Sequence, residues 1–199
     1  MNTPYKQVIE LLEKYREFMV SRQRAAHIQR MEEDGIELSQ IHHLDSEKLL
    51  IAVCAHDLFR DTRPDVLLKM AKVWNIPLTD EERAFPLLLH GKIAGEFLKR
   101  RFGIRDEEII TAVAHHTSGV PTESKIVKAL VILDTIEHGR AFPGVDELRK
   151  TAKESLDECY EKVIKNKIEY ALDNDLLVLI KSVETWNYLK LKGVHDEVF

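Results

Sequence analysis

The stretch KLLIAVCAHDLFRD (residues 48–61) carries an apolar run directly into a histidine and an aspartate. The residues from Leu49 to Val53 favour burial, and His56 and Asp57 follow them after only two more positions. A buried ionised carboxylate is costly unless it is paired, hydrogen-bonded or bound to a metal. The two residues therefore indicate either a buried hydrogen-bonded His–Asp contact or part of a functional site.

The remaining composition is that of a globular domain. The chain has 199 residues, of which 44% are hydrophobic and 32% charged, enough for one sizeable core. The net charge of -5 argues against nucleic acid as a partner, because phosphate binding normally needs a basic face. The sequence lacks signal-peptide features and a membrane-length apolar run, so we expect a cytoplasmic protein without a membrane partner. Cys54 and Cys159 have no zinc-type spacing and are predicted to be reduced and buried.

Hydrophobic spacing is helical almost throughout the chain. It predicts helices over 4–19, 46–57 and about 145–172, whereas DGIELSQIHHLD (residues 34–45) is predicted to be a loop. Asp45, Thr79 and Asp106 are candidate N-caps. Because no segment alternates as a strand does, we predict an all-α fold of about eight to ten helices.

The predicted fold is a single domain over 1–199, with a core over about 20–140 and C-terminal helices over 145–191 packed on it. These last helices either cover the core or form the interface of a homodimer.

Five apolar segments each end in, or contain, a side chain that can bind a metal. These side chains are His27, His56-Asp57, His90, His115-His116 and Asp134. A single histidine on an apolar face is usually a hydrogen-bonded core residue, but five such cases with two acids among them indicate one common site. Imidazole and carboxylate together suit Fe, Mn, Zn or a related divalent ion. Adjacent helical residues differ by about 100°, so His56 and Asp57 can contact different sides of a centre, and the carboxylate can bridge two ions.

The order His…His-Asp…His…His…Asp resembles that of the HD-domain superfamily of metal-dependent phosphohydrolases. AHHTSG (residues 114–119) and ILDTIEHGRAFPGVDELR (residues 132–149) more narrowly resemble the YqeK-type family of symmetrical bis(5′-nucleosyl)-tetraphosphatases. The resemblance extends from about residue 20 to residue 190. It implies an HD-domain helical bundle and an enzyme that splits diadenosine tetraphosphate into two ADP.

The resemblance also implies a set of metal ligands. They are His27, His56, Asp57, His90, His116 and Asp134, with His115 as the second choice for the position that His116 takes. We expect two divalent ions, with iron favoured and Mn, Zn or Mg as alternatives. One ion is expected at His27, His56 and Asp134 and the other at His90 and His116, with Asp57 between them.

In the expected mechanism, a hydroxide that bridges the two ions attacks a phosphorus of the substrate. Asp57 and Arg60 are the predicted catalytic residues, and Arg60 and Arg140 are expected to clamp the polyphosphate. The other predicted substrate contacts are Thr117, Ser118, Gly119 and Phe142. Three of these roles have structural alternatives: a helix-end ion pair for Arg140, turn formation for residues 117–119, and loop packing for Phe142.

Two positions depart from the family pattern. Arg60 stands where the family usually has lysine, so a planar guanidinium replaces a point charge. His138 and Gly139 replace the family's Pro-Asn before Arg140, and His138 is either an added donor or a solvated loop residue. Two alternative functions stay open: hydrolysis of another nucleotide or phosphoester, and metal or nucleotide binding without turnover.

Overall fold

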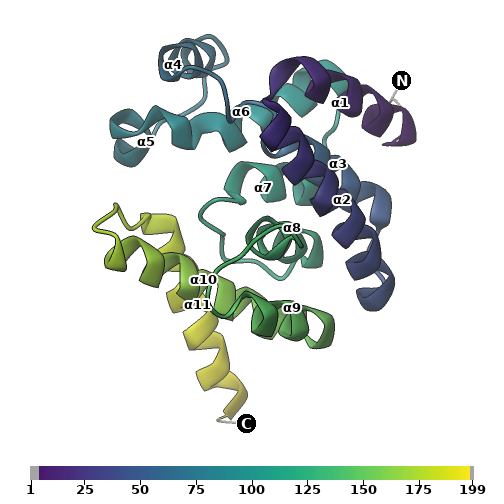
Figure 1. The fold of residues 1–199 in the computed structure, drawn as a ribbon. Helices are drawn as coiled ribbons and strands as arrows, with labels where there is room; N and C mark the ends of the chain where they lie inside the picture. The colour runs from purple at the N-terminus through teal and green to yellow at the C-terminus, as the bar shows by residue number, and fades with distance from the viewer. Residues whose placement is uncertain (1–4, 198–199) are drawn as a thin grey trace.

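Residues 5–197 of the computed structural model are described, with side chains to residue 192, and within this range all regular structure is helical (Figure 1). The eleven α-helices are α1 (Tyr5–Met19), α2 (Arg22–His42), α3 (Ser46–Ala55), α4 (Pro64–Val73), α5 (Asp80–Ala84), α6 (His90–Phe97), α7 (Glu107–His115), α8 (Lys125–Ile136), α9 (Val145–Glu154), α10 (Leu156–Asp173) and α11 (Ile180–Glu197). A 3-10 helix, η1 (Pro86–Leu89), precedes α6, and a π-helix, η2 (Leu98–Phe102), follows it. The all-α prediction is confirmed.

The helix ends follow the capping residues in the sequence. Asp45 accepts a hydrogen bond from the Lys48 N–H at the start of α3, and Asp106 does the same for the first turn of α7. The predicted helix over 145–172 divides into α9 and α10 because Ser155 has an extended backbone, with φ -152°. Its side chain accepts from the N–H of Glu158 and caps α10. This division raises the number of helices above the expected eight to ten.

The loop predicted over residues 34–45 is wrong, because α2 continues to His42. Gly35 lies inside the helix, where an added Cβ would stand at an ordinary contact distance of 3.4 Å from Leu133 Cδ1, so this position of α2 faces α8. Leu38 is buried on the same side. The helix ends at His43, whose φ of 53° is left-handed and whose N–H donates to the Ser39 carbonyl.

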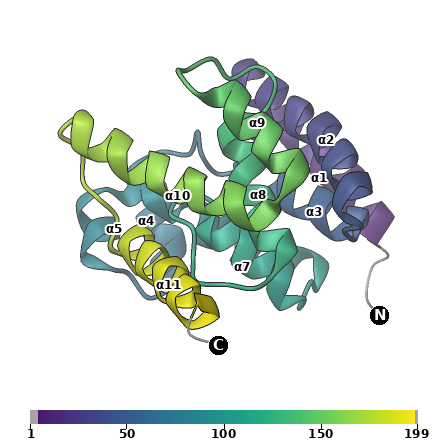
Figure 2. The same ribbon diagram turned by 90° about the horizontal axis from the view of Figure 1, so that it is seen from below.

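Helix α8 lies at the centre of the fold, with α2, α3, α7, α9 and α10 packed against it (Figure 1). Its apolar side chains are buried from Ile126 to Ile136. Figure 2 shows α10 crossing over α8, with α11 beside α10. Helix α7 also packs on α3 and α6. The helices that carry the candidate ligands are therefore direct neighbours in space.

Two further expectations concern burial and membranes. Cys54 and Cys159 are free thiols in the buried core, as predicted. Among the helices described over 5–197, none combines the length and the apolar character that a membrane crossing requires.

Candidate metal centre

Six side chains from five helices or helix ends meet beside α8. His27 comes from α2, His56 and Asp57 follow α3, His90 begins α6, His116 follows α7, and Asp134 lies in α8. The four histidines and Asp57 are each at most 5% exposed. Within the described residues two groups have ligand atoms that all lie within 4.8 Å of one another. One group is His27, His56 and Asp57, the other is Asp57, His90 and His116, and so Asp57 belongs to both.

The distances between these atoms are short. Asp57 Oδ1 lies 3.2 Å from His90 Nε2 and 3.6 Å from His116 Nε2, while Asp57 Oδ2 lies 3.7 Å from His56 Nε2. Asp134 Oδ1 lies 3.3 Å from His27 Nε2. The structure therefore brings all six predicted ligands together, with Asp57 between two pairs of imidazoles.

The Nδ1 atoms of all four histidines point away from the centre and meet acceptors. For three of them the acceptor is the backbone carbonyl three residues earlier, with Nδ1–O distances of 2.7 Å for His56 to Val53, 2.6 Å for His90 to Leu87, and 2.8 Å for His116 to Val113. His27 Nδ1 lies 3.3 Å from Glu137 Oε1. Because these oxygens only accept, each Nδ1 carries the ring proton, and the Nε2 lone pairs face the centre.

A cation fits this arrangement of lone pairs. His90 Nε2 and His116 Nε2 lie 2.9 Å apart, although neither has a proton to donate when Nδ1 is protonated. Among the described residues, the buried Nε2 atoms of His27 and His56 have no hydrogen-bond partner. Burial lowers the pKa of His56 to about 4 and also lowers the pKa of His90, so a second ring proton is disfavoured. Neutral imidazoles and carboxylates are a donor set for divalent transition metals.

Asp57 is held in its ionised form. The pKa of Asp57 lies below its ordinary range, although burial acts to raise it. Arg24 Nη1 donates to Asp57 Oδ2 at 2.7 Å. The charge needed to bridge two cations is therefore present at neutral pH.

Glu137 supports the cluster from behind His27. It is 1% exposed and accepts hydrogen bonds from Arg30 Nε at 2.5 Å and from the Gly139 N–H at 2.6 Å. Burial opposes its ionisation, but the contacts with Arg30, Gly139 and His27 lower its pKa to about 2. An ionised Glu137 fixes the proton on His27 Nδ1, an arrangement that orients many metal-bound histidines.

The HD domain family model matches residues 24–180, a range that contains all six clustered residues. The chain belongs to the HD domain family. Both the recognition of this superfamily and the predicted class of fold are thereby confirmed.

Several curated relatives of this HD domain protein share one name. The bis(5′-nucleosyl)-tetraphosphatase, symmetrical, of Bacillus subtilis is 32% identical over 157 residues, which are 78% of this chain and 83% of that protein. The protein of the same name from Staphylococcus aureus is 31% identical over 166 residues, which are 81% of this chain and 84% of that protein. The narrower resemblance to the YqeK-type family of hydrolases is confirmed.

A solved structure shares the fold of the HD domain protein. It is described as a predicted HD superfamily hydrolase involved in NAD metabolism from Clostridium acetobutylicum. The two chains are 29% identical and superpose with a TM-score of 0.86, covering 96% of this chain and 100% of the other.

The six candidate ligands are called the metal cluster below. A cavity of about 850 Å³ opens onto them, and we call it the metal cavity. Asp57, His90, His116 and Asp134 line it together with Arg24, Arg60, Arg140, Phe85, Thr117 and Leu177. Three arginines therefore line this cavity, and guanidinium groups suit the binding of a polyanion.

The predicted substrate residues divide between this cavity and other places. Arg60 and Thr117 line the metal cavity, and Thr117 Oγ1 lies 3.2 Å from His116 Nε2. Arg140 also lines it, and its Nη2 donates to Asp134 Oδ1 at 3.3 Å. Phe142 lines an adjoining cavity that also includes Asp134 and Arg140.

Ser118 and Gly119 do not line the metal cavity, so the structure does not bring these two predicted phosphate donors to the candidate ligands. Ser118 Oγ donates to the Gly119 carbonyl at 2.8 Å. The Gly119 N–H donates to the His115 carbonyl at 2.7 Å, so it is occupied within the turn. Gly119 has φ 72°, in the left-handed region that favours glycine. The turn that follows α7 requires this backbone conformation at position 119, which explains the glycine there.

Gly119→Ala is expected to destabilise the fold by about 2–4 kcal/mol. An added Cβ would stand 2.3 Å from Ile164 Cδ1 and 2.9 Å from the Tyr160 hydroxyl, and its backbone would be strained. Gly144→Ala is the matched control, since Gly144 has φ 88° but no heavy atom within 4 Å of the added Cβ. Urea unfolding measures both variants, and equal losses of stability would contradict the packing argument.

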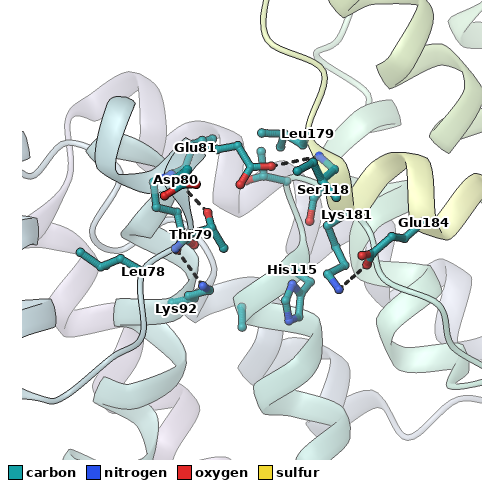
Figure 3. A pocket seen from close by; sticks show the side chains of 15 residues that line it. Leu78, Thr79, Asp80, Glu81, Lys92, His115, Ser118, Leu179, Lys181 and Glu184 are labelled. Carbon is teal, nitrogen blue, oxygen red and sulfur yellow. Dashed lines mark hydrogen bonds and ion pairs between the residues drawn. The ribbon is translucent and has the colours of Figure 1, made fainter.

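His115 and His138 both lie outside the cluster. His115, the second choice for the ligand at this position, does not line the metal cavity but another cavity of about 530 Å³, with Lys92 and Lys181 (Figure 3). The structure therefore favours His116 at the metal site. His138 is half exposed, and its Nδ1 lies 2.9 Å from Asp34 Oδ1, so it fastens its loop to α2 rather than adding a donor to the site.

Sequence reasoning missed three residues near the cluster of this HD domain protein: Arg24, Lys167 and the role of Glu137. Arg24 precedes His27 by three residues, a helical spacing that places both on one face of α2 and could have indicated its position. Lys167 Nζ lies 3.9 Å from Asp134 Oδ2 across the α8–α10 contact. No local pattern relates Lys167 to Asp134.

Proposed function

We propose that this chain hydrolyses diadenosine tetraphosphate between its second and third phosphates and releases two ADP. Two relatives named bis(5′-nucleosyl)-tetraphosphatase, symmetrical, at 32% and 31% identity, support the proposed substrate. The observation that carries the proposal is the pair of ligand groups that share Asp57, beside a cavity bordered by three arginines. Such a site suits hydrolysis of a negatively charged phosphoanhydride.

The residues would divide two divalent ions between them. His27, His56 and Asp134 would hold one, His90 and His116 the other, and Asp57 would contact both. Divalent ions at this place would lower the pKa of water and offset the negative charge on the phosphoryl oxygens. Iron, with Mn, Zn or Mg as alternatives, stays a prediction.

The side chains around the cluster would position the substrate. Arg60 and Arg140 would donate to phosphate oxygens, with paired N–H groups that match their geometry. Thr117, whose hydroxyl faces both His116 and the metal cavity, would donate to the phosphate nearest the cluster. Arg24 would hold the Asp57 carboxylate through its contact with Oδ2. The reaction adds water across one P–O–P linkage, so each ADP leaves with a terminal phosphate.

Incubation of the purified chain with Mn²⁺ and diadenosine tetraphosphate is expected to yield ADP as the sole nucleotide product. Anion-exchange chromatography separates ADP from ATP and AMP, so it distinguishes symmetrical from asymmetrical cleavage. ATP with AMP would contradict the proposed position of cleavage. Turnover only of mononucleotides or cyclic dinucleotides would favour another HD-type phosphohydrolase, and binding without turnover would favour a non-catalytic module.

The cytoplasmic location and the homodimer stay predictions of the sequence. Helix α10 packs on α8 and α9 in the single chain, and α11 packs on α10.

A further inference from the structure

A second cavity adjoins the metal cavity at Asp134. Its volume is about 690 Å³, against about 850 Å³ for the metal cavity. The two cavities share Thr117, Asp134, Arg140, Leu177 and Leu179. Both volumes lie in the range of small-molecule sites. The metal cluster therefore borders two adjoining spaces, each large enough for part of an elongated ligand.

Two basic residues line the second cavity, Arg140 and Lys167. Of these, Lys167 of α10 does not also line the metal cavity. Its Nζ lies 3.9 Å from Asp134 Oδ2, too far for a hydrogen bond, and no hydrogen bond joins it to another described residue. Its side chain is 21% exposed. The neighbouring lysines of the same helix are paired differently: Lys162 contacts Glu158 at 2.9 Å, and Lys165 contacts Glu169 at 3.4 Å. Lys167 thus has free N–H donors beside the cluster.

The walls of the second cavity suit a nucleoside. Phe142 and Pro143 form one part, and Tyr170 and Asn166 of α10 form another. Tyr170 is 61% exposed, so its ring is accessible for stacking. Asn166 supplies an amide that can both donate and accept.

The charged residues around the second cavity are placed so that they can bind a phosphate close to the cluster. Arg140 and Lys167 are its cations, and Asp134, Glu169 and Asp173 are its acids. Asp134 belongs to the candidate metal site, and Glu169 pairs with Lys165. The two cations lie within 3.9 Å of Asp134, so both stand where the two cavities meet.

Resting on the proposed function, we propose that the second cavity binds one nucleoside diphosphate half of the substrate and that Lys167 binds its phosphates. Symmetrical cleavage requires two phosphates and a nucleoside on each side of the bond that breaks. The metal cavity would hold one half and the second cavity the other. Lys167 is then a substrate-binding residue that helps to select a substrate with two nucleotide halves.

Lys167→Met tests this assignment through binding as well as activity. In the presence of Mn²⁺, calorimetric titration with ADP is expected to give two ADP per chain for the unmodified protein and one for Lys167→Met. The KM for diadenosine tetraphosphate is expected to rise at least about tenfold, because a charge-assisted hydrogen bond to phosphate is lost. Lys167→Arg is expected to restore most of the binding. Lys162→Met is the matched control, since Lys162 lies on the same helix, lines neither cavity and pairs with Glu158 at 2.9 Å.

Tyr170→Ala provides a second variant that leaves the core intact, because Tyr170 is exposed; it too is expected to lose the second ADP. One ADP per unmodified chain would overturn the assignment, as would a Lys167→Met variant with two bound ADP and an unchanged KM. If the unmodified chain does not cleave diadenosine tetraphosphate at all, the proposed function fails, and the ADP titration still decides whether the second cavity binds a nucleotide.

Discussion

Asp57→Asn is expected to abolish hydrolysis and to release the bound metal. Asp57 is the residue that the two ligand groups share in the described part of the chain. Its carboxylate lies within 3.7 Å of Nε2 in three histidines, His56, His90 and His116. An amide carries no charge to offset two cations, so we expect kcat to fall at least about 1000-fold. Elemental analysis of the purified variant measures the loss of metal.

Asp61→Asn is the matched control for this experiment. Asp61 Oδ1 lies 3.8 Å from Arg24 Nη2, so the substitution removes a charge beside the same arginine but outside the cluster. Its activity is expected to stay within about twofold of the unmodified chain. His56→Ala should lose metal and activity as Asp57→Asn does, while its circular dichroism stays helical. Normal activity in either cluster variant would rule out the two-ion mechanism.

Glu137→Gln is expected to weaken metal binding by about 10- to 100-fold without removing a ligand. The amide can present its NH₂ group to His27, and it loses the charge that Arg30 and the Gly139 N–H contact. His27 is then less firmly held with its proton on Nδ1. Titration of metal-free protein with Mn²⁺ or Zn²⁺ measures the change in affinity.

The same variant has a predictable dependence of stability on pH. The pKa of Glu137 falls from an ordinary value of 4.5 to about 2 in the folded chain. Its ionised form therefore stabilises the fold above about pH 4.5, by up to about 3 kcal/mol, and this stabilisation is lost as the pH falls toward 2. In urea unfolding of metal-free protein, the deficit of Glu137→Gln should be large at pH 7 and small near pH 2.5.

Glu33→Gln is the control for Glu137→Gln, because Glu33 lies on α2 with its side chain 57% exposed. It should change neither the metal affinity nor the pH dependence of unfolding. A stability deficit of Glu137→Gln that stays constant between pH 7 and pH 2.5 would show that the carboxylate charge is not its cause.

The helical periods and caps were readable from local sequence. Asp45, Thr79 and Asp106 cap α3, α5 and α7 as predicted, because a cap contacts N–H groups only two or three residues away. The error at residues 34–45 has a different origin. The sequence DG there favours a turn, but Gly35 lies inside α2, which contacts α8 near Leu133. That contact joins segments about a hundred residues apart, so it cannot be predicted from a local sequence pattern.

The sequence by itself determined an all-helical chain and five of the six side chains that gather beside α8, and it left the sixth between His115 and His116, because helical spacing and ligand chemistry are properties of short segments. The tertiary structure decided between His115 and His116, turned the Nε2 lone pairs inward, and placed Arg24, Glu137 and Lys167 around the cluster. His27 and Glu137 are separated by 110 positions, and Arg24 and Asp57 by 33. Contacts of this kind depend on how the helices pack. The spacing of residues within a single helix does not indicate which other helices will lie beside it.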